Sequence, residues 1–205
     1  MSTEKRFFEF IEQQALSVLS LKTSADSIEA ASKMIAAIVT SSGTVITTGM
    51  GKAGHIAAKV TSTLCSLGIP PVYLHPGEAS HGDIGIVQKG SLLFVFSNSG
   101  RTKEVLQTIG LGKKLGCSGV LFVTSHSKIA RKHADVVVDI GVRSEAGHLK
   151  IAPTTSTLCM LVVGDFIALE AAVLLGTTLS DFALRHHGGY LGAKSRRLLR
   201  QKKAS

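Results

Sequence analysis

Apolar residues recur along the chain with two different spacings, and these spacings predict two kinds of element. Over residues 4–21 they return at helical spacing, which predicts an amphipathic helix. Ser24 and Asp26 are candidate caps for a second helix that reaches about Ile38. Short apolar runs, several of them β-branched, then alternate with helical stretches. The predicted strands are residues 44–48, 71–74, 91–96, 119–124 and 135–140, and the predicted helices among them are 53–67, 103–115, 128–133 and a long one from Pro153 to about Leu175.

This alternation of strands and helices predicts an α/β fold. The run from Ser91 to Phe96 is apolar without a polar alternation, as expected of a strand that is buried on both faces. Strands separated by helices form βαβ units, so we expect a mostly parallel sheet of five strands that is covered on both faces. Such sheets bind ligands at the carboxyl ends of their strands. The loops that follow the strands are therefore the place to look for chemistry.

Composition is consistent with one folded domain and a basic end. The chain has 205 residues, of which 44% are apolar and 18% charged, as is typical of a globular protein. Its net charge is +9, and six basic residues in the stretch 194–203 leave +3 for the rest. We expect a single domain over residues 1–195 and a solvated basic tail over 196–205. The N-terminal helices, over residues 1–40, are expected to pack on the domain and on partners.

Several classes of protein are not indicated. The chain has no Trp and two Tyr, without aromatic residues interleaved among basic ones, so we expect no nucleic-acid partner. Its three cysteines, Cys65, Cys117 and Cys159, form no CxxC pair, which argues against a disulfide scaffold or a cysteine zinc site. The N-terminus does not resemble a signal peptide. The apolar stretch 157–176 contains two acids, so we expect a buried helix, no membrane contact and a cytoplasmic protein.

The first strand leads into a glycine-rich loop. Residues 49–54 read Gly-Met-Gly-Lys-Ala-Gly, which matches the GxGxxG pattern of dinucleotide sites. The next strand lacks the acid that an NAD ribose requires, because it ends in His75. The glycines are then needed only for the turn, and Lys52, in its tightest part, is a candidate to point into a ligand crevice.

The third strand leads into the most specific motif of the chain. Residues 97–104 read Ser-Asn-Ser-Gly-Arg-Thr-Lys-Glu, with hydroxyls at Ser97, Ser99 and Thr102. Free N–H groups at a helix start, together with hydroxyl donors, form an anion cradle that suits one phosphate. Ordinary N-capping of the helix is the simpler explanation of the same residues, and the two roles are compatible. Thr154, at the start of the last long helix, is a candidate to close the cradle from the far side.

Histidines and acids also gather in the loops that follow the strands. His75, His81 and His148 are potential metal ligands, but their irregular spacing does not indicate a designed site, and we predict no metal.

Taken together, these motifs resemble those of the sugar isomerase (SIS) domain. The segment 97–104 carries the general resemblance. Residues 51–57, 75–83, 152–154 and 191–192 narrow it to the arabinose 5-phosphate isomerase branch. The resemblance covers residues 10–195. It implies a five-stranded parallel sheet sandwiched by helices, in a flavodoxin- or Rossmann-like three-layer arrangement. It also implies dimers of dimers with active sites at subunit interfaces, and interconversion of D-ribulose 5-phosphate and D-arabinose 5-phosphate without a cofactor.

The resemblance also assigns roles to residues. The phosphate loop falls on Ser97, Asn98, Ser99 and Thr102, and the catalytic set on Lys52, Glu104, Glu145, His81 and His186. For an enediol route, Glu145 is expected to move the carbon proton with Glu104 in support, although the two are exchangeable. Lys52 would stabilise the oxyanion, His186 would open the sugar ring and His81 would bind a hydroxyl or relay a proton.

Some features depart from the family pattern. Ser144 precedes Glu145 where Arg is usual, His187 follows His186 where Pro is usual, and the tandem CBS domains common in the family are not matched. Two alternatives therefore remain open: a sugar-phosphate sensor without turnover, and an isomerase of another phosphosugar such as hexulose 6-phosphate.

Overall fold

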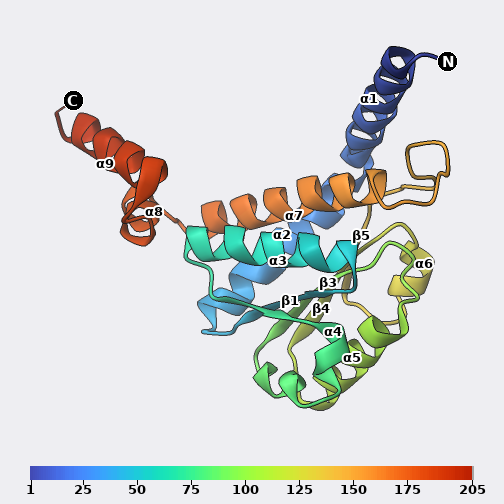
Figure 1. Cartoon of the computed structure of the whole chain (residues 1–205). Coiled ribbons are helices and arrows are strands. Elements are labelled where there is room, and N and C mark those ends of the chain that lie inside the picture. The colour runs from blue at the N-terminus through green and yellow to red at the C-terminus, as the bar shows by residue number, and fades with distance from the viewer. Residues whose placement is uncertain (205) are drawn as a thin grey trace.

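A five-stranded sheet forms the centre of the molecule (Figure 1). The computed structural model describes residues 1–204, apart from the side chains of residues 22, 203 and 204. The strands are β1 (Val45–Gly49), β2 (Pro71–Leu74), β3 (Leu92–Phe96), β4 (Gly119–Thr124) and β5 (Val136–Asp139). They pair in the order β2-β1-β3-β4-β5, and every pair is parallel. The chain passes from β1 to one side and returns to the other at β3, so a topological switch point lies between β1 and β3.

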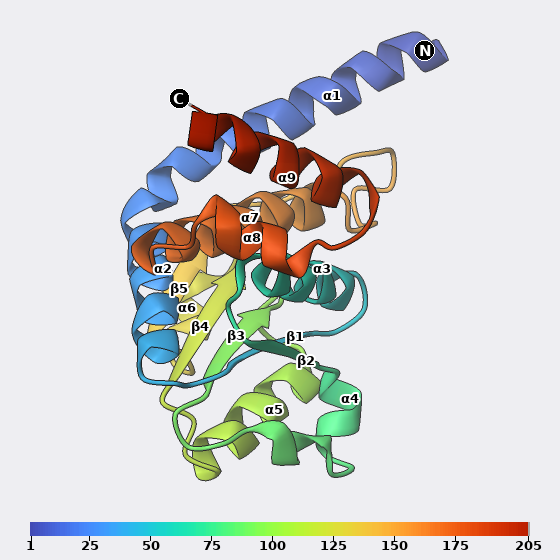
Figure 2. The ribbon, with the colours of Figure 1, turned by 90° about the vertical axis from the view of Figure 1, so that its left-hand side faces the viewer.

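Helices cover both faces of this sheet (Figures 1 and 2). Helices α2 (Ala25–Thr40), α3 (Lys52–Leu67) and α7 (Thr155–Leu174) lie on one face, and α4 (Pro76–Ala79), α5 (Lys103–Lys114) and α6 (Ser127–Ala130) lie on the other. Residues of the strands alternate between the two cores: Phe94 and Phe96 belong to the first, and Leu93 and Val95 to the second. The predicted α/β fold with a three-layer sandwich is confirmed.

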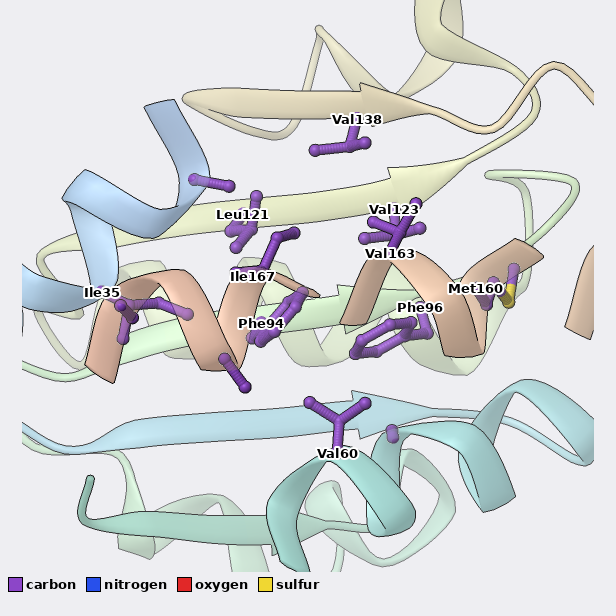
Figure 3. Packing of buried hydrophobic residues seen from close by; sticks show 14 of the residues in the cluster. Ile35, Val60, Phe94, Phe96, Leu121, Val123, Val138, Met160, Val163 and Ile167 are labelled. Carbon is purple, nitrogen blue, oxygen red and sulfur yellow. The ribbon is translucent and has the colours of Figure 1, made fainter. Parts of the chain in front are cut away.

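The larger core lies under α2, α3 and α7 (Figure 3). The rings of Phe94 and Phe96 lie 4.6 Å apart at its centre, and Val60 of α3 and Ile167 of α7 belong to the same cluster. Helix α7 approaches α3 closely at Gly164, where a Cβ would come within 2.5 Å of a Val60 methyl group. This packing holds the two helices side by side with their first residues at the carboxyl edge of the sheet.

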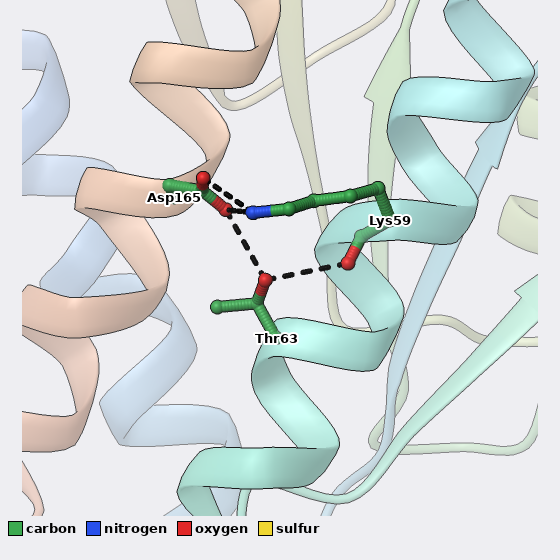
Figure 4. A network of polar contacts seen from close by, with 3 residues as sticks. All are labelled: Lys59, Thr63 and Asp165. Carbon is green, nitrogen blue, oxygen red and sulfur yellow. Dashed lines mark hydrogen bonds and ion pairs between the residues drawn. The ribbon is translucent and has the colours of Figure 1, made fainter. Parts of the chain in front are cut away.

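Helix α7 contains most of the long apolar stretch, and a neighbouring helix provides the partners of one of its two acids. By length and composition it is the one helix of the described chain that would be able to cross a membrane. Half of its residues are nevertheless buried in the protein core, as expected. Its Asp165 forms an ion pair with Lys59 of α3 and accepts a hydrogen bond from Thr63 at 3.2 Å (Figure 4).

The remaining elements lie at the ends of the chain and in one loop. Helix α1 (Thr3–Ser20) buries none of its residues and points away from the body, followed by the 3-10 turn η1 (Leu21–Ser24). The short η2 (Asp83–Ile86), α8 (Leu179–Arg185) and α9 (Gly189–Ala204) were not predicted. Helix α9 runs through the expected domain boundary at residue 195, and Ser205, the end of the expected tail, lies outside the described residues. Helix α9 was not predicted because its residues are mostly polar and show no clear apolar period. It contains Leu, Arg, Lys and Gln, which are good helix formers.

Candidate active site

A cavity of about 410 Å³ opens at the carboxyl ends of the strands, next to the switch point between β1 and β3. Six of the predicted site residues line it: Lys52, Ser97, Asn98, Ser99, Thr102 and Glu145. They come from the loops after β1, β3 and β5, and α7 contributes Ser156, Thr157 and Met160. Residues far apart in the sequence are thus brought to one concave surface.

The β1–α3 turn places Lys52 at this cavity. Gly51 has φ +60°, a conformation that favours glycine, and it directs the chain from the strand into α3. A Cβ on Gly54 would come within 2.3 Å of the Gly49 carbonyl, so that glycine allows the close contact of strand and helix. Local geometry therefore accounts for these glycines without a dinucleotide, and Lys52, as the first residue of α3, lines the cavity.

The β3–α5 loop also lines the cavity. Ser97 Oγ and Thr102 Oγ1 share a hydrogen bond of 3.0 Å, and the Arg101 N–H donates to Ser99 Oγ at 3.2 Å. Gly100 completes the loop with φ +63°. Within the described chain, the N-cap Thr102 makes no side-chain capping bond, so its hydroxyl does not occupy the N–H groups of the first turn of α5. N–H groups at a helix start, hydroxyls and the positive end of a helix dipole are the kind of groups that bind a phosphate.

Asn98 fastens this loop to β4. Its carbonyl accepts hydrogen bonds from the Ser125 N–H and from Thr124 Oγ1, both at 3.1 Å, and lies 3.0 Å from His126 Nδ1. Its side-chain Oδ1 is buried and has no hydrogen-bond partner among the described residues. Asn98 also lines the cavity, and a buried amide oxygen without a partner is unusual in a folded protein.

Glu145 is the one acid that lines the cavity in the part of the chain that is described. The residue is buried, with 7% of its surface exposed. Its Oε2 accepts hydrogen bonds from the N–H groups of Thr154 and Ser156, each at 3.0 Å. Its Oε1 accepts a hydrogen bond from Ser156 Oγ. The carboxylate therefore caps α7, and its charge lies at the positive end of that helix. A carboxylate has about four lone-pair positions, so one on Oε1 remains for a ligand.

Thr154 lies next to this carboxylate but does not line the cavity. Its N–H binds Glu145, and its buried Oγ1 has no partner within residues 1–204. One turn further along α7, burial and the Glu145 carboxylate raise the pKa of the Cys159 thiol to about 11. This thiol stays neutral at physiological pH and is not a nucleophile.

Three residues of the expected catalytic set do not line the described cavity. Glu104 is exposed in the first turn of α5, and His81 is exposed in the turn between α4 and η2. His186 follows α8, where its Nδ1 lies 2.8 Å from the Phe182 carbonyl and its ring stacks on the Phe182 ring at 3.9 Å. Helix α8 packs against α3, with Arg185 beside Gly68 at the end of that helix. Since α3 has 16 residues, it separates His186 from Lys52 by about 24 Å along its axis.

Sequence reasoning missed three cationic or polar residues of the cavity. His126 follows β4, Arg143 follows β5, and Lys150 lies in the loop before α7 with φ +53°, which is unusual for a residue other than glycine. The rule that ligands bind at the carboxyl ends of strands would have found His126 and Arg143. The described residues contain no group of three potential metal ligands, so His75, His81 and His148 do not form a cluster.

Comparisons with known proteins agree with this architecture. The SIS domain model matches residues 38–170. The arabinose 5-phosphate isomerase KdsD of Pseudomonas aeruginosa is 38% identical over 189 residues, which cover 92% of this chain and 56% of that enzyme. The chain spans about half the length of the curated relatives it matches.

Solved structures are also similar. A Bacteroides fragilis protein described as a phosphosugar isomerase involved in capsule formation superposes with a TM-score of 0.86 and 36% identity, over 92% of this chain and all of that one. The c3406 protein of Escherichia coli CFT073, solved in complex with arabinose 5-phosphate, has a TM-score of 0.75 and 35% identity, over 91% of this chain and all of that one. The fold, the carboxyl-edge cavity and the matched residues lead to one conclusion: the chain belongs to the SIS domain family.

Proposed function

We propose that the protein is an aldose–ketose isomerase of a sugar phosphate, and that it interconverts D-arabinose 5-phosphate and D-ribulose 5-phosphate in the cytoplasm. The observation that carries the proposal is one cavity that is lined by Ser97, Asn98, Ser99 and Thr102, the proposed phosphate cradle, and also by Lys52 and Glu145. The similarity to KdsD enzymes, and to a protein whose structure contains arabinose 5-phosphate, supports the choice of substrate.

The chemistry requires few groups. The phosphate binds in the β3–α5 loop and supplies binding energy remote from the reacting carbons. A base removes the proton from the carbon next to the carbonyl, and an enediolate forms. The proton returns to the neighbouring carbon, so that the carbonyl moves between C1 and C2. Lys52 stabilises the charge that develops on the oxygen, and Glu145 is the proposed base because its carboxylate lies on the cavity wall with one lone pair free.

Glu104, His81 and His186 complete the proposed set. None of the three lines the described cavity of a single chain, which supports a site that a second copy completes, with His186 as the acid–base group for ring opening. We therefore propose a homo-oligomer, a dimer of dimers. Exposed large apolar side chains provide surface for it: Phe7, Phe8 and Ile11 on α1, and Phe166, Leu169 and Val173 on α7.

The test is proton NMR of the purified protein with ribulose 5-phosphate in heavy water, with a Lys52→Ala variant as control. Arabinose 5-phosphate with deuterium at C2 is the expected product, because the enediol exchanges its proton with solvent. The absence of product with every pentose and hexulose phosphate tested would contradict the enzyme assignment. The Glu145→Gln variant then tests the base: deuterium uptake at the wild-type rate would contradict its role and favour Glu104.

A sugar-phosphate sensor without turnover is the second candidate. Only Glu145, of the three residues Glu104, Glu145 and His186, lines the described cavity of a single chain, which is compatible with binding alone. Thermal stabilisation by arabinose 5-phosphate with no deuterium uptake would support this alternative. Conversion of hexulose 6-phosphate in preference to the pentose would point to the other isomerase class.

A further inference from the structure

A second, smaller cavity lies beside the candidate active site. It has a volume of about 280 Å³, and His126 and Arg143 line both cavities. Its other polar lining comes from Arg101 in the β3–α5 loop, from Ser125 after β4, and from Ser127 and Lys128 of α6. One water occupies about 30 Å³ in the liquid, so the cavity has room for a phosphate group and several waters.

The charges around this cavity are unbalanced. Arg101, Lys128 and Arg143 reach it from three different segments, and within residues 1–204 its lining contains no acidic side chain. The ion pairs found among described residues join Lys33 to Glu29 and Lys59 to Asp165, and none involves these three cations. Like charges gathered on one concave surface repel one another, and a bound anion removes that repulsion.

Two of the residues that line this cavity have donors without a partner among the described residues. Arg143 donates one hydrogen bond, to the Ser125 carbonyl, and a guanidinium has five N–H donors. Ser125 is fully buried and its Oγ has no partner among the described groups. A buried hydroxyl without a partner is unfavourable, and a bound anion that accepts its hydrogen bond would remove that cost. The Asn98 carbonyl accepts a hydrogen bond from the Ser125 N–H and lies 3.0 Å from His126 Nδ1, which positions this segment.

We propose that this cavity is a second phosphate-binding site, in which Arg101, Lys128 and Arg143 bind the oxygens and Ser125 and Ser127 supply hydroxyl donors. The phosphate has two possible sources: a free phosphate, or the second phosphate of a bisphosphorylated sugar whose first phosphate lies in the β3–α5 loop. His126 and Arg143 line both cavities, so the two cavities are neighbours and one bisphosphorylated ligand would be able to occupy both. Binding of a bisphosphorylated sugar rests on the proposed function, because its first phosphate lies in the β3–α5 loop, whereas binding of a free phosphate does not.

Equilibrium dialysis with inorganic phosphate tests the site in the whole chain. The wild type should bind two phosphates per chain. Lys128→Gln should raise the Kd of one of the two phosphates about tenfold, because one charge-assisted contact is lost. Lys132→Gln, which removes the same charge from an exposed position outside the cavity lining, should keep both. Arg101→Gln should repeat the effect of Lys128→Gln. One phosphate per chain, or equal binding by the 128 and 132 variants, would overturn the proposal.

A competition experiment separates the two sources. If the site takes a free phosphate, saturating arabinose 5-phosphate displaces one inorganic phosphate and the second stays bound. If it takes the second phosphate of a sugar, a pentose 1,5-bisphosphate displaces both at once, and Lys128→Gln weakens the bisphosphate about tenfold while leaving the monophosphate unchanged. Failure of arabinose 5-phosphate to compete with either phosphate would count against the proposed substrate and leave the second site intact.

Discussion

The two ends of helices α3 and α7 differ in how their backbone groups are satisfied. At the carboxyl edge of the sheet, among the described groups, neither N-cap residue, Gly51 or Thr154, makes a side-chain capping bond. At the opposite edge both helices end in a left-handed glycine. Gly68 and Gly176 donate back to Cys65 and Val173, and the residues that follow them donate to Leu64 and Ala172. These are Schellman caps, which satisfy the last carbonyl groups.

We call the carboxyl edge of the sheet the open edge, because the N-cap side chains of the described chain make no capping bond there. We call the opposite edge the closed edge, because the last carbonyl groups there are satisfied. At the open edge the first N–H groups of each helix receive no bond from the N-cap side chain, and the Glu145 carboxylate accepts from those of Thr154 and Ser156 at α7. His186 lies at the closed edge, with its ring stacked on Phe182. A catalytic set that includes both Lys52 and His186 thus has members at both edges, and the predictions below test whether two copies of the chain bring them together.

The largest effect is expected at the open edge, from Lys52→Met. Loss of the cation that stabilises the enediolate should lower kcat/KM by about 10²- to 10³-fold, the range typical of one oxyanion-stabilising group. The measurement is deuterium-exchange kinetics with ribulose 5-phosphate. Lys59→Met, on the same helix and paired with Asp165, should retain activity within a few-fold; an equal loss would show that the effect is structural.

The next prediction connects the two edges. Lys52→Met and His186→Ala should each be nearly inactive, and the two proteins, denatured together and refolded as an equal mixture, should recover about a quarter of wild-type activity. Half of randomly formed dimers are mixed, and each mixed dimer has one intact site of two. Activity no higher than the mean of the separate variants would contradict a site shared between copies.

Stability separates the two glutamates. Glu145→Gln places an amide N–H₂ opposite the donors of α7 and should destabilise the fold by about 1–3 kcal/mol, because a buried hydrogen-bonding group loses its partner. Glu104→Gln, on an exposed first turn, should change stability by no more than about 0.5 kcal/mol. Urea unfolding of both variants measures this difference, and equal midpoints would remove the capping role of Glu145.

A smaller effect is expected from Cys159, one turn inside the open end of α7. Burial, followed by the Glu145 charge, raises its pKa from 9.0 to about 11. The folded state therefore holds this proton more tightly than the unfolded state, and its contribution to stability is complete below pH 9 and is lost as the pH rises toward 11. Urea unfolding between about pH 8 and pH 11 should show a shallower decline for Cys159→Ala than for the wild type. Parallel curves would contradict the shift.

The smallest effect is expected midway between the two edges, at the Lys59–Asp165 pair. Both side chains are partly exposed, at 47% and 31%, so Asp165→Asn should cost about 0–1 kcal/mol. The cost should shrink further in about 1 M salt, where screening is strong. Glu170→Gln, on the same helix and without an ion pair among the described residues, is the matched control. A cost that does not change with salt would indicate that Thr63 rather than the charge pair holds the carboxylate.

The regular elements of the domain were predictable because they depend on local pattern. The strands appear as short apolar runs, and helices such as α3 and α5 begin close to the residues expected. Helices α8 and α9 were missed because the signals of α8, a capping box between Thr178 and Asp181, are short, and because α9 has few apolar residues. The contacts that hold α8 in place, such as Thr177 Oγ1 with the Leu67 carbonyl at 3.2 Å, are remote in sequence.

The sequence by itself determined the class of fold, the parallel sheet and the loops in which chemistry would lie. Strand and helix periods, and glycines such as Gly51, act over a few residues and are visible in the order of amino acids. The tertiary structure alone decided which candidates share a cavity. It brought Glu145 to the N-terminus of α7, gathered Arg101, Lys128 and Arg143 around a second cavity, and left His186 at the far edge. These outcomes depend on how whole helices pack on the sheet, and packing joins residues that no local pattern connects.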